Sequence, residues 1–515
     1  MMHVAIALGL SLATAHVVQR VLEYRRAAAN VGDFPVVRRL MHPSARDLVV
    51  RRPPSVIFER PDDQRETAYE KAGWDAFPLI SFYPTMIVTV SVADPAAIKE
   101  ITTHRARFPK PLEMYGPIKI FGTNVVTTEG SEWRKHRKIA APAFSEKNYR
   151  MVWGETARIM RDLLESEWQH APEIKVDAID LTIPLTLYII ASAGFGHRIS
   201  WAEEKNVPAG HTMTFKESIH IVSTRVFHKL ITPRWMLGWT ASLRRLRDAF
   251  DNFDKYMFEM IEVRRSRETK EERADLFTNL LQATELETVS KLTDRELAGN
   301  IFIFLLAGHE TTAHTLCFCL AYLALYPHVQ DRVYEEVKLV LPSADSLLEY
   351  EDMGRLPYTM ACLFETLRLI PPVLRIPKVS GEDQSLVISN VAGEKRTMPL
   401  PKGTRISIDT AALHRNPRFW SEPNEFKPER FLGDWPRDAF VPFSQGPRSC
   451  IGRRFAETEV TVILAMLLSQ YRVAVTNEPQ FAHETFEQRK ARVFENRPGL
   501  TTTPVRVPLT FTRRY

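Results

Sequence analysis

Cys450 lies in the segment whose residue types most strongly suggest chemistry, Phe443-Ser-Gln-Gly446-Pro-Arg448-Ser-Cys450-Ile-Gly452. An apolar stretch with helical spacing follows it, so the sulfur would lie near a helix N-terminus. There the helix dipole and the free backbone N–H groups stabilise a thiolate. A lone cysteine cannot supply the four ligands of a zinc site. The pattern therefore favours one thiolate on the axis of a heme iron, and the alternative is a buried, inert cysteine.

A second group of polar residues, Ala307-Gly308-His309-Glu310-Thr311-Thr312, interrupts a long apolar stretch. A glycine inside a helix costs about 1 kcal/mol relative to alanine, which suggests that something approaches the backbone closely. A carboxylate beside a hydroxyl is also a poor choice for a packed core. The segment therefore indicates either a polar site that faces a ligand or a helix kink whose hydroxyls bond back to the preceding turn.

Two further pairs have the spacing of neighbours on a helix. Glu365 and Arg368 are three residues apart among apolar neighbours, so we expect them to be buried and to need a further partner. Trp133 and Arg137 are four residues apart, on one helical face. The alternative for this second pair is an ordinary basic surface helix.

The elements that must position these residues are mostly helical. Thr293-Asp-Arg-Glu296 is a capping box, and the helical pattern after it continues towards Tyr326 before Pro327. A helix of this length would span about 50 Å at 1.5 Å per residue. Because its first half is apolar almost all round, we expect it to be buried at the centre of the fold.

Short strands are expected on both sides of the helical part. Residues 77–83 and 85–92 predict a hairpin, and Asp94-Pro95 predicts a capped helix start. Three later segments predict a strand, an apolar helix and a strand-and-turn tail at 405–408, 454–471 and 491–513. Helical and strand patterns interleave, so we predict one large domain at 61–515, mainly α with small β-sheets (α+β).

The N-terminus predicts a membrane anchor. Residues 4–18 are mostly apolar, and Arg20, Arg25 and Arg26 follow them. Positive charge after the apolar stretch, with none before it, favours an uncleaved anchor helix at 1–26 whose C-terminal side stays cytoplasmic. The alternative is a cleaved signal peptide, since Ala13-Thr14-Ala15 resembles a signal-peptidase site. Scattered prolines and arginines at 27–60 predict a hinge.

Composition narrows the class of protein further. The 515 residues carry a net charge of +6 without a long Lys/Arg block, which argues against nucleic acid and favours anionic lipid or an acidic protein partner. Four cysteines are too few for a disulfide framework. Cys317, Cys319 and Cys362 are expected to be small core residues, which suits a reducing compartment.

The segment around Cys450 resembles the heme-binding loop of the cytochrome P-450 superfamily. Residues 307–312 resemble its oxygen-activation motif, and Glu365-Thr-Leu-Arg368 with Pro428-Glu429-Arg430-Phe431 resembles its structural triad. The motifs occur in the family's order. The resemblance implies the cytochrome P-450 fold, with a long central helix over the heme. At the hinge the chain departs from the family, because its proline cluster is sparser.

The resemblance also implies a role for each matched residue. Cys450 would be the axial ligand of heme b, and Thr311 and Glu310 would bind dioxygen and relay protons. Ala307 and Gly308 would leave room over the heme. The expected propionate partners are Trp133, Arg137, Arg375 and Arg448. Phe443 would lie beside the sulfur, Gly446 and Gly452 would allow close approach of the cofactor, and Glu365, Arg368 and Arg430 would maintain the fold.

The implied activity is that of a membrane-bound monooxygenase. It would insert one oxygen atom of O2 into a hydrophobic small molecule, such as a terpenoid, steroid-like, fatty or aromatic compound. Electrons would come from NADPH through a flavoprotein, the NADPH-cytochrome reductase. The implied location is the endoplasmic reticulum membrane, with the catalytic domain in the cytoplasm. The segment Arg105-Ala-Arg-Phe-Pro-Lys-Pro111 resembles basidiomycete fungal members, which implies secondary metabolism or xenobiotic oxidation.

By the same resemblance, five segments would line the substrate pocket, at 110–126, parts of 205–245, 302–312, 373–376 and 496–502. Two alternatives remain. One is a peroxygenase or isomerase on the same heme fold, which needs no reductase. The other is a non-catalytic heme-binding or lipid-binding membrane protein.

Overall fold

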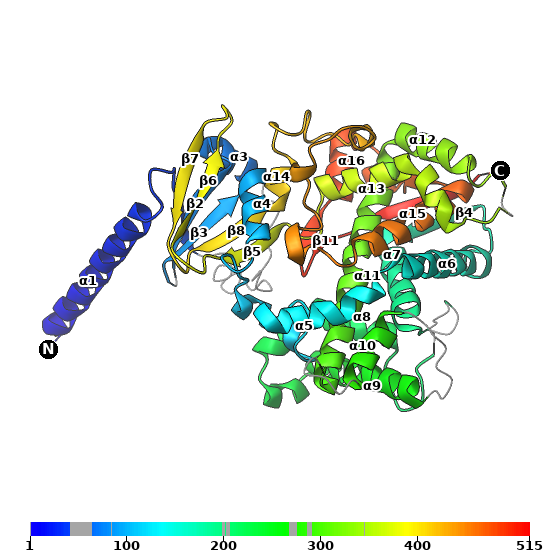
Figure 1. Cartoon of the computed structure of the whole chain (residues 1–515), viewed down its shortest axis with the longest axis horizontal. Coiled ribbons are helices and arrows are strands. Elements are labelled where there is room, and N and C mark those ends of the chain that lie inside the picture. The colour runs from blue at the N-terminus through cyan, green and yellow to red at the C-terminus, as the bar shows by residue number, and fades with distance from the viewer. Residues whose placement is uncertain are drawn as a thin grey trace. The chain divides into compact units, whose positions relative to one another are not determined.

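In the computed structural model, residues 2–41, 64–83, 85–197, 201, 206–266, 275–285, 291–343 and 346–514 are described. They fall into two compact units. Unit 1 comprises residues 1–111, 373–423 and 436–449, and unit 2 comprises residues 112–372, 424–435 and 450–515. Unit 1 carries most of the strands, whereas unit 2 is mostly helical (Figure 1).

A five-stranded sheet organises unit 1. Its strand order is β1-β2-β3-β8-β5, with β1 Val37–Met41, β2 Ala76–Tyr83, β3 Ile87–Val92, β8 Arg405–Asp409 and β5 Arg375–Val379. β2 and β3 are antiparallel, which confirms the predicted hairpin, and β3 pairs with β8 in parallel. A second, two-stranded sheet pairs β6 Gln384–Ser389 with β7 Lys395–Leu400.

The helices of unit 1 are α1 Met2–Ala29, α3 Gln64–Ala72, α4 Pro95–Thr103 and α14 Thr410–His414, and the 3-10 turns are η9 Arg437–Ala439 and η10 Gly446–Arg448. The predicted cap of α4 is confirmed, because the Ala97 N–H donates to Asp94 Oδ1 at 3.0 Å and Pro95 is the first helical residue. The second Asp94 oxygen accepts the Ser389 N–H at 2.9 Å, so one carboxylate joins α4 to β6.

The predicted anchor corresponds to α1, which continues to Ala29. Apolar side chains along it are exposed, among them Ile6, Leu10, Leu12 and Val17. Among the described residues, α11 Asp294–Leu325 is the one helix long and apolar enough to cross a membrane, and 78% of its apolar window is buried inside the protein. The predicted hinge at 27–60 includes strand β1, which pairs with β2, while residues 42–60 lie outside the described residues.

The long helices of unit 2 surround α11 (Figure 1). They are α5 Gly130–Ala140, α6 Glu146–Asp162, α7 Ala178–Ile189, α8 Phe215–Ile231, α9 Ala241–Ser266, α10 Leu276–Glu285, α12 Pro327–Lys338, α13 Pro357–Leu369, α15 Arg453–Gln470 and α16 Phe486–Val493. Shorter helical segments are η1 Leu112–Lys119, η2 Ala141–Ala143, η3 Leu163–Glu167, η4 Ile190–Gly194, η6 Arg234–Gly238, η7 Tyr350–Arg355, η8 Pro428–Phe431 and η11 Pro479–Phe481. Its strands are β4 Glu173–Asp177, β9 Tyr471–Val475, β10 Asn496–Pro498, β11 Thr502–Pro504 and β12 Pro508–Arg513.

The central helix α11 forms as predicted. The Thr293 N–H donates to Glu296 Oε2 at 2.9 Å and the Glu296 N–H donates to Thr293 Oγ1 at 3.2 Å, so both halves of the capping box are present. Most of its 32 residues are buried. A Cβ at Gly299 would lie 2.7 Å from the backbone of Gly122. Glycine at this position therefore allows the loop that contains Gly122 to approach α11 closely.

Candidate functional site

The predicted ligand Cys450 lies two residues after η10 and shortly before α15. Of the four cysteines it is the exposed one, while Cys317, Cys319 and Cys362 are buried as predicted. Desolvation by the surrounding protein raises the pKa of Cys450, against the lowering effects of the Gly452 N–H and Arg137. Coordination to a metal would remove the proton.

The predicted oxygen-activation segment is an open stretch on an otherwise buried helix. Ala307 is exposed and Thr311 is partly exposed, although residues 301–306 before them are buried. The Thr311 hydroxyl donates to the Ala307 carbonyl at 2.8 Å, the back-bonding of the kink alternative. Back-bonding does not explain an exposed Ala307 at mid-helix, so we favour a face that is open to a ligand.

Gly308 is a point of close approach to its helix, as its place in a buried helix suggested. A Cβ there would lie 3.0 Å from Ile190 Cγ1, at the start of η4. Glycine therefore permits close packing of α11 against η4.

Glu310 is linked to a residue that sequence reasoning missed. Desolvation raises the pKa of Glu310 to about 7, although a hydrogen bond from Thr501 lowers it. The Thr501 hydroxyl donates to Glu310 Oε1 at 3.3 Å. Thr501 lies in the segment 496–502 that was expected to line the pocket, but no motif marks it. A carboxyl with this pKa can hold and release a proton near neutral pH.

The predicted structural triad is brought together. Arg368 donates to both oxygens of Glu365, at 2.7 and 2.8 Å, and Arg430 Nε donates to Glu365 Oε1 at 3.0 Å. The side chains of Glu365 and Arg368 are fully buried. The Lys427 N–H also donates to Glu365, at 2.8 Å, so every charge in the group has several partners.

The residues predicted to hold the propionates are divided between the units. In unit 2, Trp133 is buried and Arg137 is half-buried on α5, and desolvation lowers the pKa of Arg137 although the nearby Cys450 raises it. In unit 1, Arg375 lies 3.7 Å from the Asp409 carboxylate, so part of its charge is already balanced. Arg448 is partly buried at the end of η10, and Phe443 is partly buried before it.

Gly446 is required by the backbone of unit 1. Its φ is +70°, and a Cβ there would lie 2.6 Å from the Thr102 carbonyl oxygen of α4. This close approach is to the backbone of α4. A Cβ at Gly452 would lie 4.0 Å from Cys450 Sγ, which is an ordinary contact.

Gly446→Ala should destabilise the loop by about 1–3 kcal/mol, because both the left-handed backbone and the contact with Thr102 oppose a side chain. Urea unfolding measures the loss. Gly433→Ala is the matched control, since a Cβ there meets nothing within 4 Å. Equal midpoints for the two variants would contradict this reason for the glycine.

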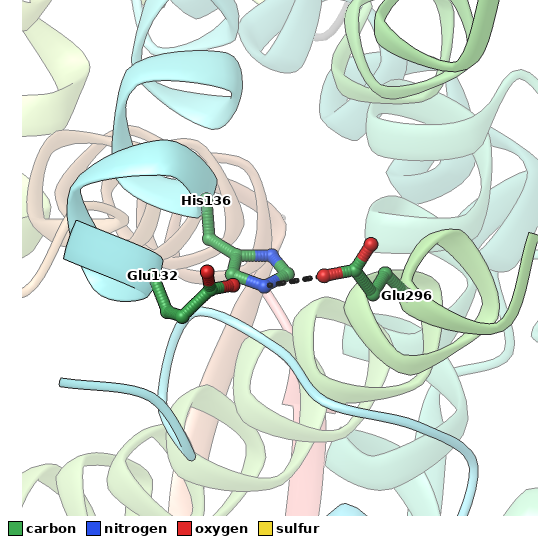
Figure 2. A group of neighbouring side chains, drawn as sticks. All are labelled: Glu132, His136 and Glu296. Carbon is green, nitrogen blue, oxygen red and sulfur yellow. Dashed lines mark ion pairs between the residues drawn. The ribbon is translucent and has the colours of Figure 1, made fainter. Parts of the chain in front are cut away.

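A histidine and two glutamates form a cluster with metal-ligand geometry (Figure 2). Glu132 and His136 lie on α5 and Glu296 lies on α11, with candidate ligand atoms within 4.8 Å of one another. However, Lys135 Nζ already donates to Glu296 Oε1 at 2.7 Å, so an ammonium supplies the positive charge that a metal would bring. Although desolvation raises the pKa of Glu296, this lysine holds it below its usual value.

The tautomer of His136 also opposes metal binding. Asn300 accepts the Val125 N–H at 3.1 Å through its Oδ1, which places its NH2 group 2.8 Å from His136 Nδ1. Nδ1 must therefore accept, and the ring proton is on Nε2, which points to Glu296 at 3.6 Å. We interpret the cluster as a clamp that joins α5 to α11.

Comparison with known proteins identifies the family of this chain. The cytochrome P-450 family model matches residues 57–497. The chain is 47% identical over 522 residues to cytochrome P-450 monooxygenase 124 of Postia placenta, covering 100% of both chains. It is 27% identical to the human ultra-long-chain fatty acid omega-hydroxylase, covering 71% of this chain and 70% of that one.

A solved cytochrome P-450 heme domain shares the fold, with a TM-score of 0.74 at 24% identity over 94% of this chain and 98% of that one. The predicted fold class is thereby confirmed. Together with the family match and the relative of full length, this shows that the chain belongs to the cytochrome P-450 family of monooxygenases, which carry heme on a cysteine thiolate.

Proposed function

We propose that Cys450 is the cysteine that binds the heme iron in this monooxygenase. The observation that carries the assignment is that Cys450 alone among the four cysteines is exposed. Its surroundings also suit an iron-bound thiolate, because the Gly452 N–H donates to the sulfur and Arg137 and Arg453 carry nearby positive charge. The exposed stretch at Ala307 provides a face of α11 with room for a flat group.

The chain's own residues would position the cofactor and move protons. Trp133, Arg137, Arg375 and Arg448 would hold its propionates, since a guanidinium pairs with a carboxylate through two parallel hydrogen bonds. Phe443 would pack beside the sulfur. Thr311 and Glu310 would deliver protons on the open face of α11. The heme, when bound, supplies the binding and reduction of dioxygen.

We also propose that the electrons come from NADPH through the NADPH-cytochrome reductase. Two observations in unit 2 support an acidic partner of this kind. Arg134 and Lys138 are exposed on α5, and Arg453 and Arg454 are exposed at the start of α15, close to Cys450 in the sequence. Positive surface charge of this kind steers an acidic partner during encounter.

The membrane attachment is proposed from α1. Its exposed apolar side chains, such as Leu10 and Leu12, would be unfavourable in water over so long a stretch. Arg20, Arg25 and Arg26 follow them, on the side that would stay in the cytoplasm. We therefore propose that α1 anchors the protein in the endoplasmic reticulum membrane with the catalytic part in the cytoplasm.

For the substrate we propose a hydrophobic small molecule. Among the segments expected to line the pocket, Phe302, Phe304, Leu305 and Leu374 are apolar. Apolar residue types at these positions suit terpenoid, steroid-like, fatty or aromatic compounds better than charged ones.

Reconstitution with the reductase tests the proposed electron source. In liposomes with NADPH and the reductase, the holoenzyme should oxidise a compound selected from a hydrophobic library by its binding spectrum. Turnover with hydrogen peroxide and none with NADPH would instead favour a peroxygenase. Heme binding without turnover under either condition would favour a non-catalytic binding protein.

A further inference from the structure

Three buried or partly buried side chains of unit 2 form a continuous chain of polar contacts. Glu310 and His314 lie one turn apart on α11, and Thr501 approaches them from the turn between β10 and β11. Thr501 Oγ1 lies 3.3 Å from Glu310 Oε1 and 2.7 Å from His314 Nδ1. Thr501 is 5% exposed and His314 is 3% exposed, so bulk water does not replace either contact.

The turn that carries Thr501 is held in place by its neighbours. The Thr501 carbonyl accepts the Gly499 N–H at 3.2 Å and the Thr503 hydroxyl at 3.0 Å. The next residue, Thr502, donates its N–H to the Pro372 carbonyl at 2.9 Å and its hydroxyl to the Pro371 carbonyl at 3.0 Å. The Thr501 hydroxyl is therefore a fixed bridge between the two α11 side chains.

The bridge can point in two directions, because a threonine hydroxyl has a single proton. If Glu310 is ionised, its carboxylate must accept that proton, and His314 must then donate from Nδ1 to Thr501. If Glu310 is protonated, it can donate to Thr501 Oγ1, and the hydroxyl then donates to His314 Nδ1. The His314 proton is in that case on Nε2.

His314 can change its tautomer here without becoming charged. Desolvation lowers its pKa to about 3, with His309, Arg497 and His220 acting in the same direction. His309 itself stays neutral, because desolvation lowers its pKa to about 4 while its Nδ1 lies 2.7 Å from the Leu305 carbonyl oxygen. The imidazole therefore stays neutral over the whole neutral range, with its single proton on either Nδ1 or Nε2.

We propose that Thr501 and His314 form a hydrogen-bonded relay with Glu310, in which the tautomer of His314 follows the protonation of Glu310. The relay rests on the proposed role of Glu310 in proton delivery. When Glu310 gives up its proton, the Thr501 hydroxyl turns to donate to the carboxylate, and the single proton of the neutral His314 ring moves from Nε2 to Nδ1. The reverse changes occur when Glu310 takes up a proton again. Both residues are positioning residues, since they act through Glu310.

Nitrogen NMR of the full-length holoprotein labelled with 15N-histidine tests the relay. The reduced carbon monoxide complex is diamagnetic and suits the measurement, and His314→Phe identifies the signals. As pH rises through about 7, the pKa of Glu310, His314 Nδ1 should change from unprotonated to protonated while the ring stays neutral. Thr501→Val should abolish this change, and Glu310→Gln should do the same.

Two variants control for structure. Thr501→Ser keeps the hydroxyl and should keep the pH-dependent change. Thr503→Val removes a hydroxyl that bonds to the backbone of the same turn, and should leave the change intact. A His314 signal that titrates identically in wild type and Thr501→Val would overturn the relay, as would one that does not respond to pH in wild type.

The same samples separate this inference from the proposed function. Their absorption spectrum shows whether a thiolate-bound heme is present. A missing thiolate spectrum would refute the assignment of Cys450, while the His314 shifts would still decide whether the relay exists.

Discussion

Glu365→Gln should destabilise the protein by about 3–5 kcal/mol, because it leaves two arginines with reduced compensation in the interior. Arg368 is fully buried, and its guanidinium is held by both oxygens of Glu365. Arg430 is 11% exposed and shares the same carboxylate. A neutral amide keeps the shape of the side chain but removes the charge that balances them. Urea unfolding followed by circular dichroism gives the loss.

The matched control is Glu382→Gln. Glu382 also accepts from an arginine, with 3.1 Å between its Oε1 and Arg107 Nε, but its side chain is 59% exposed. Exposed pairs contribute about 0–1 kcal/mol, so this variant should unfold near the wild-type midpoint. If Glu365→Gln unfolds there too, the triad does not maintain the fold.

Removal of the Glu310 carboxyl should cause a large loss of activity. General acid–base groups contribute about 10²–10⁴-fold, so Glu310→Gln should lower coupled turnover by a factor in that range. Burial raises the pKa of Glu310 to about 7. The proton-bearing form therefore predominates below that pH and is lost as the pH rises through it. Wild-type coupling should fall across the same range, and the Glu310→Gln variant should show no such dependence.

In Thr311→Val, electrons from NADPH should be diverted to hydrogen peroxide, because Thr311 is proposed to deliver protons together with Glu310. Thr315→Val is its control, because both hydroxyls donate to the carbonyl four residues earlier at 2.8 Å. Thr315 is buried, whereas Thr311 is on the open stretch. NADPH, peroxide and product are measured together. Normal coupling in Thr311→Val, or equal uncoupling in both variants, would remove Thr311 from proton delivery.

Local signals explain which elements could be predicted from the sequence. The capping box and Pro327 are close to the ends of α11, and the cap at Asp94 lies within one turn of the N–H group that it accepts. The contact between Glu365 and Arg368 follows from helical spacing alone. Each of these features depends on residues only a few positions apart, so a short stretch of sequence is enough to predict it.

Contacts across the fold explain what could not be predicted. Thr501 and Glu310 are 191 residues apart, and no local pattern indicates that they meet. The reason for Gly308 also required the position of Ile190. The contact between Arg375 and Asp409 likewise depends on the pairing of β5 with β8, which no local pattern indicates.

The difference spectrum of the reduced protein with carbon monoxide is the most direct test of the heme-thiolate assignment. We predict that the full-length wild-type protein shows the Soret shift typical of a thiolate-bound heme, and that Cys450→Ala loses it. Cys362→Ala should retain it, since Cys362 is buried away from water. A missing shift in the wild type, or one that survives in Cys450→Ala, would contradict the assignment of Cys450 as the ligand.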